Sequence, residues 1–270
     1  MKKKLIVVAD DFGFSEAYNY GVIKAYKEGI VTVLSLMSNM GAAAHAVRLW
    51  KQEAEDACMV QHTNFVQGCP VSKPEDISSL VDEKGMFYRS SSWKPENGQD
   101  KKCTGDVVPT AEDCYKETVA QLERHKELTG KYPIHLEGHS VMTAPVKEGF
   151  RKAAEKFQIH CMTMPEEETE RMYPAHELAF GNPEYMSAIM RGTRPEDFFE
   201  DRLGLLKSPF EINVMHFHPG YLDNYIFENT SLTVPRCIDL ETLCNPKVRE
   251  WLMEHEVELV DFKAVYKVYK

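Results

Sequence analysis

The chain has 270 residues, of which 43% are hydrophobic and 27% charged, and its formal net charge is -10. This acidic balance argues against a nucleic-acid partner, because phosphate backbones are bound by clustered Lys and Arg side chains. No apolar run approaches the roughly 18 residues that a membrane span requires, so we expect no membrane partner.

The first predicted element is a buried strand that ends in two adjacent carboxylates. The apolar run Leu5–Ala9 is typical of a parallel strand covered on both faces, and Asp10 and Asp11 follow it before Phe12-Gly13 turns the chain. The carboxyl ends of strands are where α/β proteins place their chemistry. Neighbouring acids repel unless a cation, a proton or solvent separates their charges. The pair therefore indicates a metal ion, with two solvated turn acids as the alternative.

Helices and strands then alternate up to residue 64. Ser15 is a candidate N-cap for the next helix and Gly29 its stop. The third strand leads into His62-Thr63-Asn64. The predicted elements are helices 15–28 and 42–52 and strands 31–37 and 57–61. This alternation predicts a mostly parallel sheet.

The alternation of strands and helices stops between Phe65 and about Thr110. This segment is a long insertion rich in Gly, Pro, Ser and charged residues. It carries the aromatic residues Phe87, Tyr88 and Trp93. Ordered loops of this length are usually functional, so one hypothesis is a lid that lays an aromatic ring against a sugar face. The alternative is a partly disordered insertion.

The second half of the chain continues the alternation, and two of its strands lead directly into His139 and His218. The predicted elements are helices 112–129, 146–157, 183–191, 195–206 and 246–254, strands 134–138, 159–163, 211–217 and 258–262, and an acidic irregular loop over 165–182. Six or seven strands alternating with helices favour a single α/β domain over residues 1–270. Its expected architecture is a distorted, incomplete (β/α) barrel of about seven strands rather than a flat doubly wound sheet.

Histidines follow three of the later strands, at His62, His139 and His218. Parallel strands deliver their carboxyl ends to one rim, so these imidazoles are expected beside Asp10 and Asp11 in a metal site with spare acid and base groups. Ligands of this kind suit zinc, manganese, iron or magnesium. The residues alone do not distinguish the roles of the two aspartates, nor do they choose His218 over His216.

Such a site predicts metal-assisted hydrolysis of an amide or ester. A divalent ion held by one carboxylate and two imidazoles lowers the pKa of a bound water, to ~7 for zinc, and polarises a carbonyl oxygen. The second carboxylate then accepts the proton of the water, and a separate histidine protonates the leaving atom.

The scattered cysteines favour a reducing compartment. There are seven of them, with no Cys-x-x-Cys pair, which is typical of reduced structural thiols. The basic start Met1–Lys4 leads at once into the first strand, without the longer apolar region and cleavage site of a signal peptide. We therefore expect a cytoplasmic protein.

Four motifs resemble those of the YdjC-like carbohydrate deacetylases, which include chitooligosaccharide deacetylases. They are Val8-Ala9-Asp10-Asp11-Phe12-Gly13, Gln61-His62-Thr63-Asn64, His135-Leu136-Glu137-Gly138-His139 and His218-Pro219, and they follow the family's order. Asn19-Tyr20-Gly21 and Pro235-Arg236 add support. The resemblance covers nearly the whole chain and implies a distorted barrel related to the polysaccharide deacetylases.

The resemblance also implies a function and a set of roles. The expected protein is a hydrolase that removes acetyl groups from N-acetylated mono- or oligosaccharides of the chitooligosaccharide or diacetylchitobiose type. Its metal would be magnesium, with zinc or manganese as alternatives, and family habit favours a homodimer. The implied metal ligands are Asp11, His62 and His139, the general base Asp10 and the general acid His218, and the candidate substrate contacts are Asn64, Arg236 and Trp93.

One motif departs from the family pattern. Many members carry His-Leu-Asp-Ser-His followed by further histidines, whereas this chain has Glu137, Gly138 and then Ser140-Val141-Met142-Thr143 after the ligand His139. The longer carboxylate and the missing imidazoles alter the surroundings of the metal. An alternative function is therefore a catalytically silent sugar-binding or regulatory protein on the same fold. A phosphorylation receiver is disfavoured, because His62 follows the third strand where the acceptor aspartate is needed.

Overall fold

The computed structural model describes residues 2–96, 103–162, 175–179 and 182–266. Its centre is a parallel sheet with the strand order β5-β4-β3-β2-β1-β7-β6, and β8 pairs with the start of β1. The strands are β1 (Lys4–Phe12), β2 (Val33–Leu36), β3 (Cys58–Thr63), β4 (His135–Gly138), β5 (His160–Cys161), β6 (Ala175–Glu177), β7 (Ile212–Phe217) and β8 (Glu258–Leu259). The seven-strand path curls, and among the described residues no pairing joins its two end strands, β5 and β6, which confirms the predicted incomplete (β/α) barrel.

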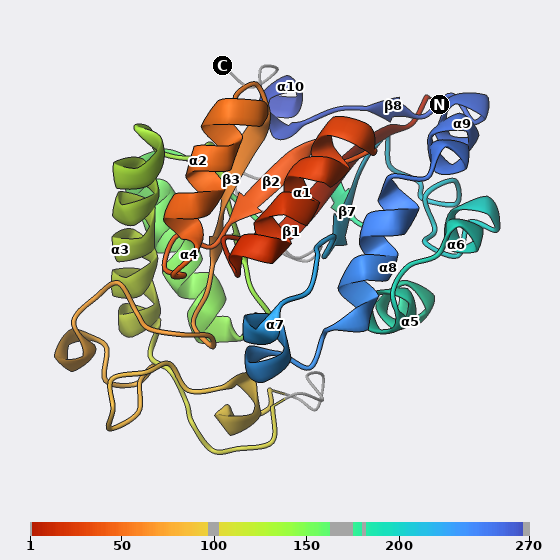
Figure 1. The fold of residues 1–270 in the computed structure, drawn as a ribbon. Helices are drawn as coiled ribbons and strands as arrows, with labels where there is room; N and C mark the ends of the chain where they lie inside the picture. Colours follow the sequence, from red (N-terminus) through yellow and green to blue (C-terminus); the bar gives the residue numbers. More distant parts are fainter. Residues whose placement is uncertain (1, 97–102, 163–174, 180–181, 267–270) are drawn as a thin grey trace.

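Helices surround this sheet, and most of them cover its outer face (Figure 1). They are α1 (Glu16–Glu28), α2 (Ala43–Glu53), α3 (Ala111–Thr129), α4 (Ala144–Phe157), α5 (Pro183–Arg191), α6 (Pro195–Phe199), α7 (Asn224–Asn229), α8 (Val234–Leu243), α9 (Pro246–Glu254) and α10 (Phe262–Tyr266). Ser15 caps α1 as predicted, since its hydroxyl accepts from the backbone N–H of Tyr18. None of the helices in the described ranges is both long and apolar enough to cross a bilayer.

The alternation of side chains along β1 separates two hydrophobic clusters. Leu5 and Val7 belong to the large cluster under the outer helices, whereas Ile6 and Val8 face the inside of the curled sheet. Phe262 and Tyr266 of α10 pack into that inner cluster. The inside of the sheet below Asp10 is therefore filled mainly with apolar side chains, among which the buried His135 stacks on Phe262.

The insertion at residues 65–110 is packed over its described parts, 65–96 and 103–110. It contains the short 3-10 helices η1 (Pro74–Asp76) and η2 (Ser90–Ser92), and its aromatic residues join Phe150 of α4 in a separate hydrophobic cluster. The buried carboxylate of Glu117 in α3 holds the insertion by accepting from two backbone N–H groups, those of Val71 and Ser72, both at 2.9 Å. Residues 97–102 lie outside the described ranges.

The structure corrects several predicted elements. Part of the predicted loop over 165–182 forms strand β6, while residues 163–174 and 180–181 lie outside the described ranges. Helices α7 and α8 occupy a stretch for which we predicted no element. The predicted last strand is only the two residues of β8, followed by α10. The helix predicted over 195–206 ends at Phe199. Short or polar elements of this kind carry little periodic signal.

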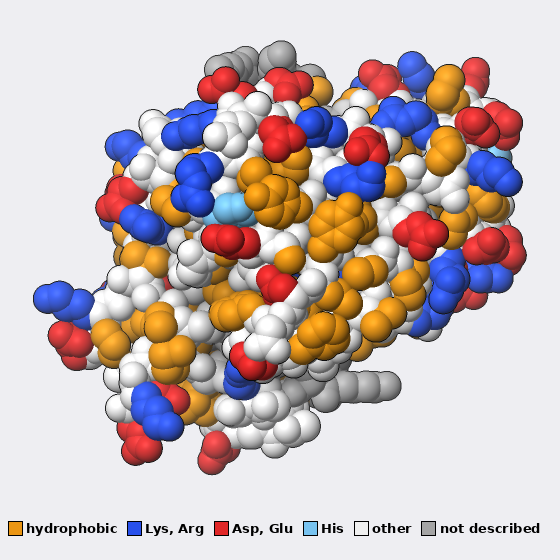
Figure 2. Space-filling model, viewed as in Figure 1, with side chains coloured by type: hydrophobic (Ala, Val, Ile, Leu, Met, Phe, Trp, Pro, Cys, Tyr) orange, Lys and Arg blue, Asp and Glu red, His pale blue; other side chains and the backbone are white. Residues whose placement is uncertain are grey.

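On the face shown in Figure 2, acidic and basic side chains lie interspersed among apolar ones.

Candidate metal centre and active site

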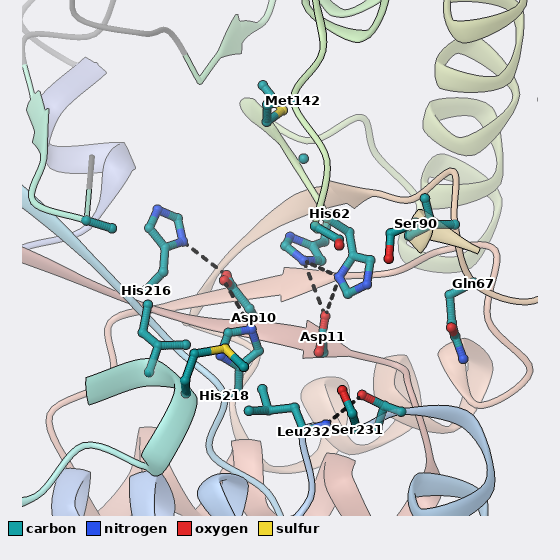
Figure 3. Close-up of a pocket in the computed structure, with 18 of the residues that line it drawn as sticks. Asp10, Asp11, His62, Gln67, Ser90, Met142, His216, His218, Ser231 and Leu232 are labelled. Carbon is teal, nitrogen blue, oxygen red and sulfur yellow. Dashed lines mark hydrogen bonds and ion pairs between the residues drawn. The ribbon is translucent and has the colours of Figure 1, made fainter. Parts of the chain in front are cut away.

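A cavity of about 360 Å³ opens at the carboxyl ends of the strands. Asp10 and Asp11 of β1, His62 of β3, and His216 and His218 at or beyond the end of β7 point into it (Figure 3), and His139 after β4 also lines it. The insertion contributes the polar groups of Gln67, Arg89 and Ser90 to its walls, and Asn229, Thr230 and Ser231 add further polar groups. The apolar lining residues include Met142, Met162, Met186, Ile189 and Met190.

A local irregularity in β1 brings both aspartates to the cavity. In a regular strand adjacent side chains point to opposite faces, so only one of the two would face inward. Asp11 instead has a φ of 61°, in the left-handed region, and the pairing of β1 with β2 shifts register between Ala9 and Phe12. This bulge turns the strand end so that Asp10 and Asp11 both line the cavity.

Asp11, His62 and His139 form a compact set of possible metal ligands. Asp11 Oδ1 lies 2.9 Å from His139 Nδ1 and 3.3 Å from His62 Nε2, and the two ring nitrogens are 3.3 Å apart. Bonds of roughly 2.0–2.1 Å to one divalent ion place neighbouring ligand atoms about 3.0–3.4 Å apart. The three donor atoms therefore fit a single small divalent cation.

Further side chains hold these three in place. Glu137 is fully buried, with Oε1 3.3 Å from His62 Nδ1, and the Ser35 hydroxyl donates to the same carboxylate oxygen. A carboxylate behind a histidine fixes its tautomer and ring orientation for a metal. The departure at Glu137 therefore acts on His62, a possible metal ligand whose other ring nitrogen, Nε2, lies beside Asp11.

Arg236 secures the carboxylate of Asp11 from the other side. Its Nη2 donates to Asp11 Oδ2 at 2.9 Å, and its guanidinium lies 4.7 Å from the centre of the Tyr18 ring. Burial by itself would raise the pKa of Asp11, but His139 and Arg236 outweigh burial and hold that pKa well below its usual value. Asp11 is therefore a carboxylate at neutral pH.

Asp10 belongs to a second cluster of polar side chains, which it forms with His216 of the neighbouring strand β7 and Glu177 of β6. Its Oδ1 lies 3.1 Å from His216 Nδ1, and the other ring nitrogen, Nε2, lies 2.9 Å from Glu177 Oε2 in β6. Burial raises the pKa of Asp10 to about 6, against the opposing effect of His216 and His62. Asp10, Glu137 and His216 also offer donor atoms within 4.8 Å of one another.

His218 lies just beyond the end of β7, at the mouth of the second cluster. Its backbone N–H donates to Asp239 Oδ2 at 3.0 Å, and Thr193 N donates to the other oxygen of the same carboxylate at 2.7 Å. His218 Nε2 lies 4.0 Å from Asp10 Oδ2. Burial lowers the pKa of His218 to about 3, so its ring is neutral in the free site.

The structure brings most of the predicted site residues together in one cavity and leaves two of them outside its lining. Asp10, Asp11, His62, His139, His218 and Arg236 all line one cavity. The prediction of substrate contact is corrected for Trp93, which is 0% exposed within the hydrophobic cluster of the insertion. It is corrected also for Asn64, whose fully buried side chain donates to Gln67 O and accepts from Val66 N. Neither belongs to the described lining of the cavity.

Two residues of the site were not assigned a role from the sequence. Glu177 lies in the three-residue strand Ala175–Glu177, which has no apolar pattern to reveal it. His216 was left as an alternative to His218, and the structure separates them: His216 lies within β7 and His218 beyond its end. The two-residue spacing on one strand was the available signal for His216.

Two proteins that are named carbohydrate deacetylases align with almost the whole chain. Carbohydrate deacetylase 2 of Listeria innocua serovar 6a is 31% identical over 271 residues, which cover 98% of this chain and 99% of that protein. A carbohydrate deacetylase of Clostridium beijerinckii is 31% identical over 273 residues, covering 97% of this chain and 100% of that protein.

Solved structures share the fold. A protein of Enterococcus faecalis V583, for which cellobiose-phosphate cleavage has been suggested, superposes with a TM-score of 0.79 at 22% identity, covering 98% of this chain and 99% of that one. A mutant of a CE4 family pseudoenzyme of Bacillus anthracis, with restored enzymatic activity, gives a TM-score of 0.52 at 11% identity over 98% of this chain and 67% of that one. The sequence model of the YdjC-like proteins matches residues 4–254. With this match and relatives at 31% identity over almost its whole length, the chain belongs to the YdjC-like protein family.

Proposed function

We propose that the protein is a metal-dependent carbohydrate deacetylase that removes acetyl groups from N-acetylated mono- or oligosaccharides. The observation that carries this proposal is the meeting of the three-ligand set Asp11, His62 and His139 with Asp10 and His218 in one cavity. Two relatives at 31% identity are named carbohydrate deacetylases, which supports a sugar substrate. We favour chitooligosaccharides such as N,N'-diacetylchitobiose as the substrate class.

The metal would be held by Asp11, His62 and His139. When bound, a divalent ion supplies Lewis-acid chemistry that polarises the amide carbonyl and lowers the pKa of water. We favour magnesium from the family resemblance, with zinc or manganese as alternatives. The two imidazole nitrogens of the set make zinc and manganese chemically reasonable.

Asp10 and His218 would move the proton that the hydrolysis requires. Asp10, with a pKa of about 6, is mostly ionised at pH 7 and accepts the proton of the attacking water. His218 is neutral in the free site, and its Nε2 is 4.0 Å from Asp10 Oδ2. Closing of this gap, directly or through a water, would let the proton taken by Asp10 pass through His218 to the leaving amide nitrogen. One water is consumed, and acetate and the free amine are released.

The walls of the cavity suit a sugar with an apolar face and hydroxyl groups. Gln67, Arg89 and Ser90 offer hydrogen-bonding groups, and the methionines of the lining offer a deformable apolar surface. Arg236 supports this proposal differently from our prediction. It lines the cavity, but its guanidinium pairs with the carboxylate of Asp11, so its main role is to hold a metal ligand.

The decisive experiment is release of acetate from N,N'-diacetylchitobiose and related N-acetylated sugars by the purified protein. We expect acetate that disappears with a chelator, returns with added divalent ion, and is abolished by Asp10→Asn. Asp106→Asn is the matched control, because Asp106 is an exposed carboxylate of the insertion. A chelator-insensitive activity would contradict the metal role.

A silent sugar-binding protein remains the second candidate function, and the altered motif at Glu137 favours it. It predicts that diacetylchitobiose binds, in calorimetry or by a shift of the melting temperature, while no acetate appears with any of the metals. That result would overturn the proposed hydrolase.

A further inference from the structure

His216 lies between two carboxylates, one on each of its ring nitrogens. Nδ1 is 3.1 Å from Asp10 Oδ1 in β1, and Nε2 is 2.9 Å from Glu177 Oε2 in β6. An ionised carboxylate only accepts hydrogen bonds, and a neutral imidazole carries a single N–H. Both contacts are hydrogen bonds only when the ring is an imidazolium that donates on both sides.

The surroundings of His216 favour that charge. The residue is 8% exposed, and a third carboxylate oxygen, Glu137 Oε1 in β4, lies 4.0 Å from Nδ1. From α5, the Tyr185 hydroxyl accepts from the backbone N–H of His216 at 2.8 Å and lies 3.1 Å from its carbonyl oxygen. Burial opposes a charged ring, but the three carboxylates outweigh burial and raise the pKa of His216 well above its usual value.

The charge balance of the whole site also favours a positively charged His216 ring. Its buried carboxylates, Asp10, Asp11, Glu137, Glu177 and the Asp239 that accepts from His218 N, exceed by two the positive charges of Arg236 and a divalent ion held by Asp11, His62 and His139. An imidazolium at His216 lowers this excess to one negative charge. Uncompensated charges are costly in a buried site, so a positive ring is favoured.

We propose that His216 is a positioning residue for Asp10: as an imidazolium secured by Glu177, it holds Asp10 Oδ1 and leaves Oδ2 facing His218. This inference rests on the proposed function, in which Asp10 is the base. Oδ2 is the oxygen nearest His218 Nε2, so the clamp selects which oxygen handles the proton. The contacts Asp10–His216–Glu177 connect strand β1 through β7 to the edge strand β6, so β6 takes part in ordering the base.

The same atoms suggest a rival occupant, a second cation between Asp10, Glu137 and His216. A cation on Nδ1 would replace the hydrogen bond to Asp10. The contacts as they stand are satisfied by a proton on each ring nitrogen, so the geometry favours the imidazolium. The count of bound metal ions per chain separates the two cases.

The first test reads the protonation of His216 directly. In protein labelled with ¹⁵N in its histidine rings, we expect a ring with both nitrogens protonated at pH 8, where an ordinary histidine with a pKa of about 6.5 is mostly neutral. His216→Asn identifies the signal by removing it, and Glu177→Gln should lower the pH at which the ring loses its proton. A ring with one proton at pH 8, or two metal ions per chain falling to one in His216→Asn, would overturn the inference.

The second test separates positioning from binding. His216→Leu removes both contacts, and we expect kcat for acetate release to fall on the order of 100-fold, the lower range for loss of general-base catalysis, with KM changed less than about 2-fold. His216→Asn keeps an N–H near Asp10 but no charge, and should recover part of kcat. His176→Asn is the control, because His176 is the neighbour of Glu177 in β6 and stacks on Phe210.

Loss of binding with kcat unchanged would contradict a positioning role. If the wild-type protein releases no acetate from any sugar, the proposed function fails. In that case the ring signal and its dependence on Glu177 still decide whether His216 is the charged clamp.

Discussion

Shortening Glu137 by one methylene is expected to weaken metal binding more than removing its charge. In the structure Glu137 Oε1 lies 3.3 Å from His62 Nδ1, and the whole residue is 0% exposed. Glu137→Asp restores the residue type of the family pattern but withdraws the carboxylate by roughly 1.5 Å, the length of one C–C bond. The gap to His62 then approaches about 5 Å, beyond hydrogen-bond reach.

The magnitude follows from the contact that is lost. A hydrogen bond to a charged group contributes about 1.5–3 kcal/mol, and about 1.4 kcal/mol is a factor of ten in affinity. We therefore expect Glu137→Asp to weaken the metal about 10- to 100-fold, the range typical for partners of ligating histidines. Glu137→Gln keeps the length and an oxygen that accepts from His62, so its loss should be about 10-fold or less.

The assay is metal affinity measured by competition with a chromophoric chelator, beside the rise in melting temperature that saturating metal produces. Glu112→Gln is the control, since Glu112 is exposed near the start of α3. If Glu137→Asp binds metal as tightly as the wild type, or if Glu137→Gln binds more weakly than Glu137→Asp, Glu137 does not act by holding His62.

Two further predictions concern stability. His125 is fully buried and burial lowers its pKa to about 3, whereas the unfolded chain has an ordinary pKa of about 6.5. The unfolded state therefore binds the extra proton first, and stability falls as the pH drops below 6.5, by about 3 kcal/mol at pH 4.5. Urea unfolding at both pH values should show this loss reduced in His125→Gln, and an equal loss in both proteins would refute the assignment. A Cβ at Gly138 would lie 2.4 Å from Met142 Sδ, so Gly138→Ser should destabilise the protein by on the order of 1 kcal/mol. Adding Met142→Ala should recover most of that stability, and strictly additive effects in denaturant melts would contradict the coupling.

The departures from the family motif have a common physical basis in the tertiary structure. Gly138 leaves room for the Met142 side chain, which lines the cavity, and Glu137 supports His62. The sequence could show that these residues differ from the family pattern. Only the packing showed that one change acts on His62, a proposed metal ligand, and the other on the cavity wall.

The general plan of the protein was readable from local patterns. Apolar runs of strand length alternating with helical periodicity predicted the curled parallel sheet, and that sheet in turn predicted a common rim for Asp10, Asp11, His62, His139 and His218. This inference works because parallel strands share one direction, so every strand end contributes to the same edge. The roles of these residues remain predictions that the experiments above test.

Other features were decided only by tertiary structure. The sequence left open whether the insertion is a lid with an aromatic ring against a sugar or partly disordered, but the Trp93 ring is buried because the insertion packs its large apolar groups against α3 and α4. Glu177 enters the site because the polar strand β6 pairs with β7, a contact between segments that no local pattern couples. Both aspartates face the cavity because Asp11 adopts a left-handed backbone conformation. Local sequence specifies periodicity, whereas burial, strand pairing and bulges depend on residues distant in the chain.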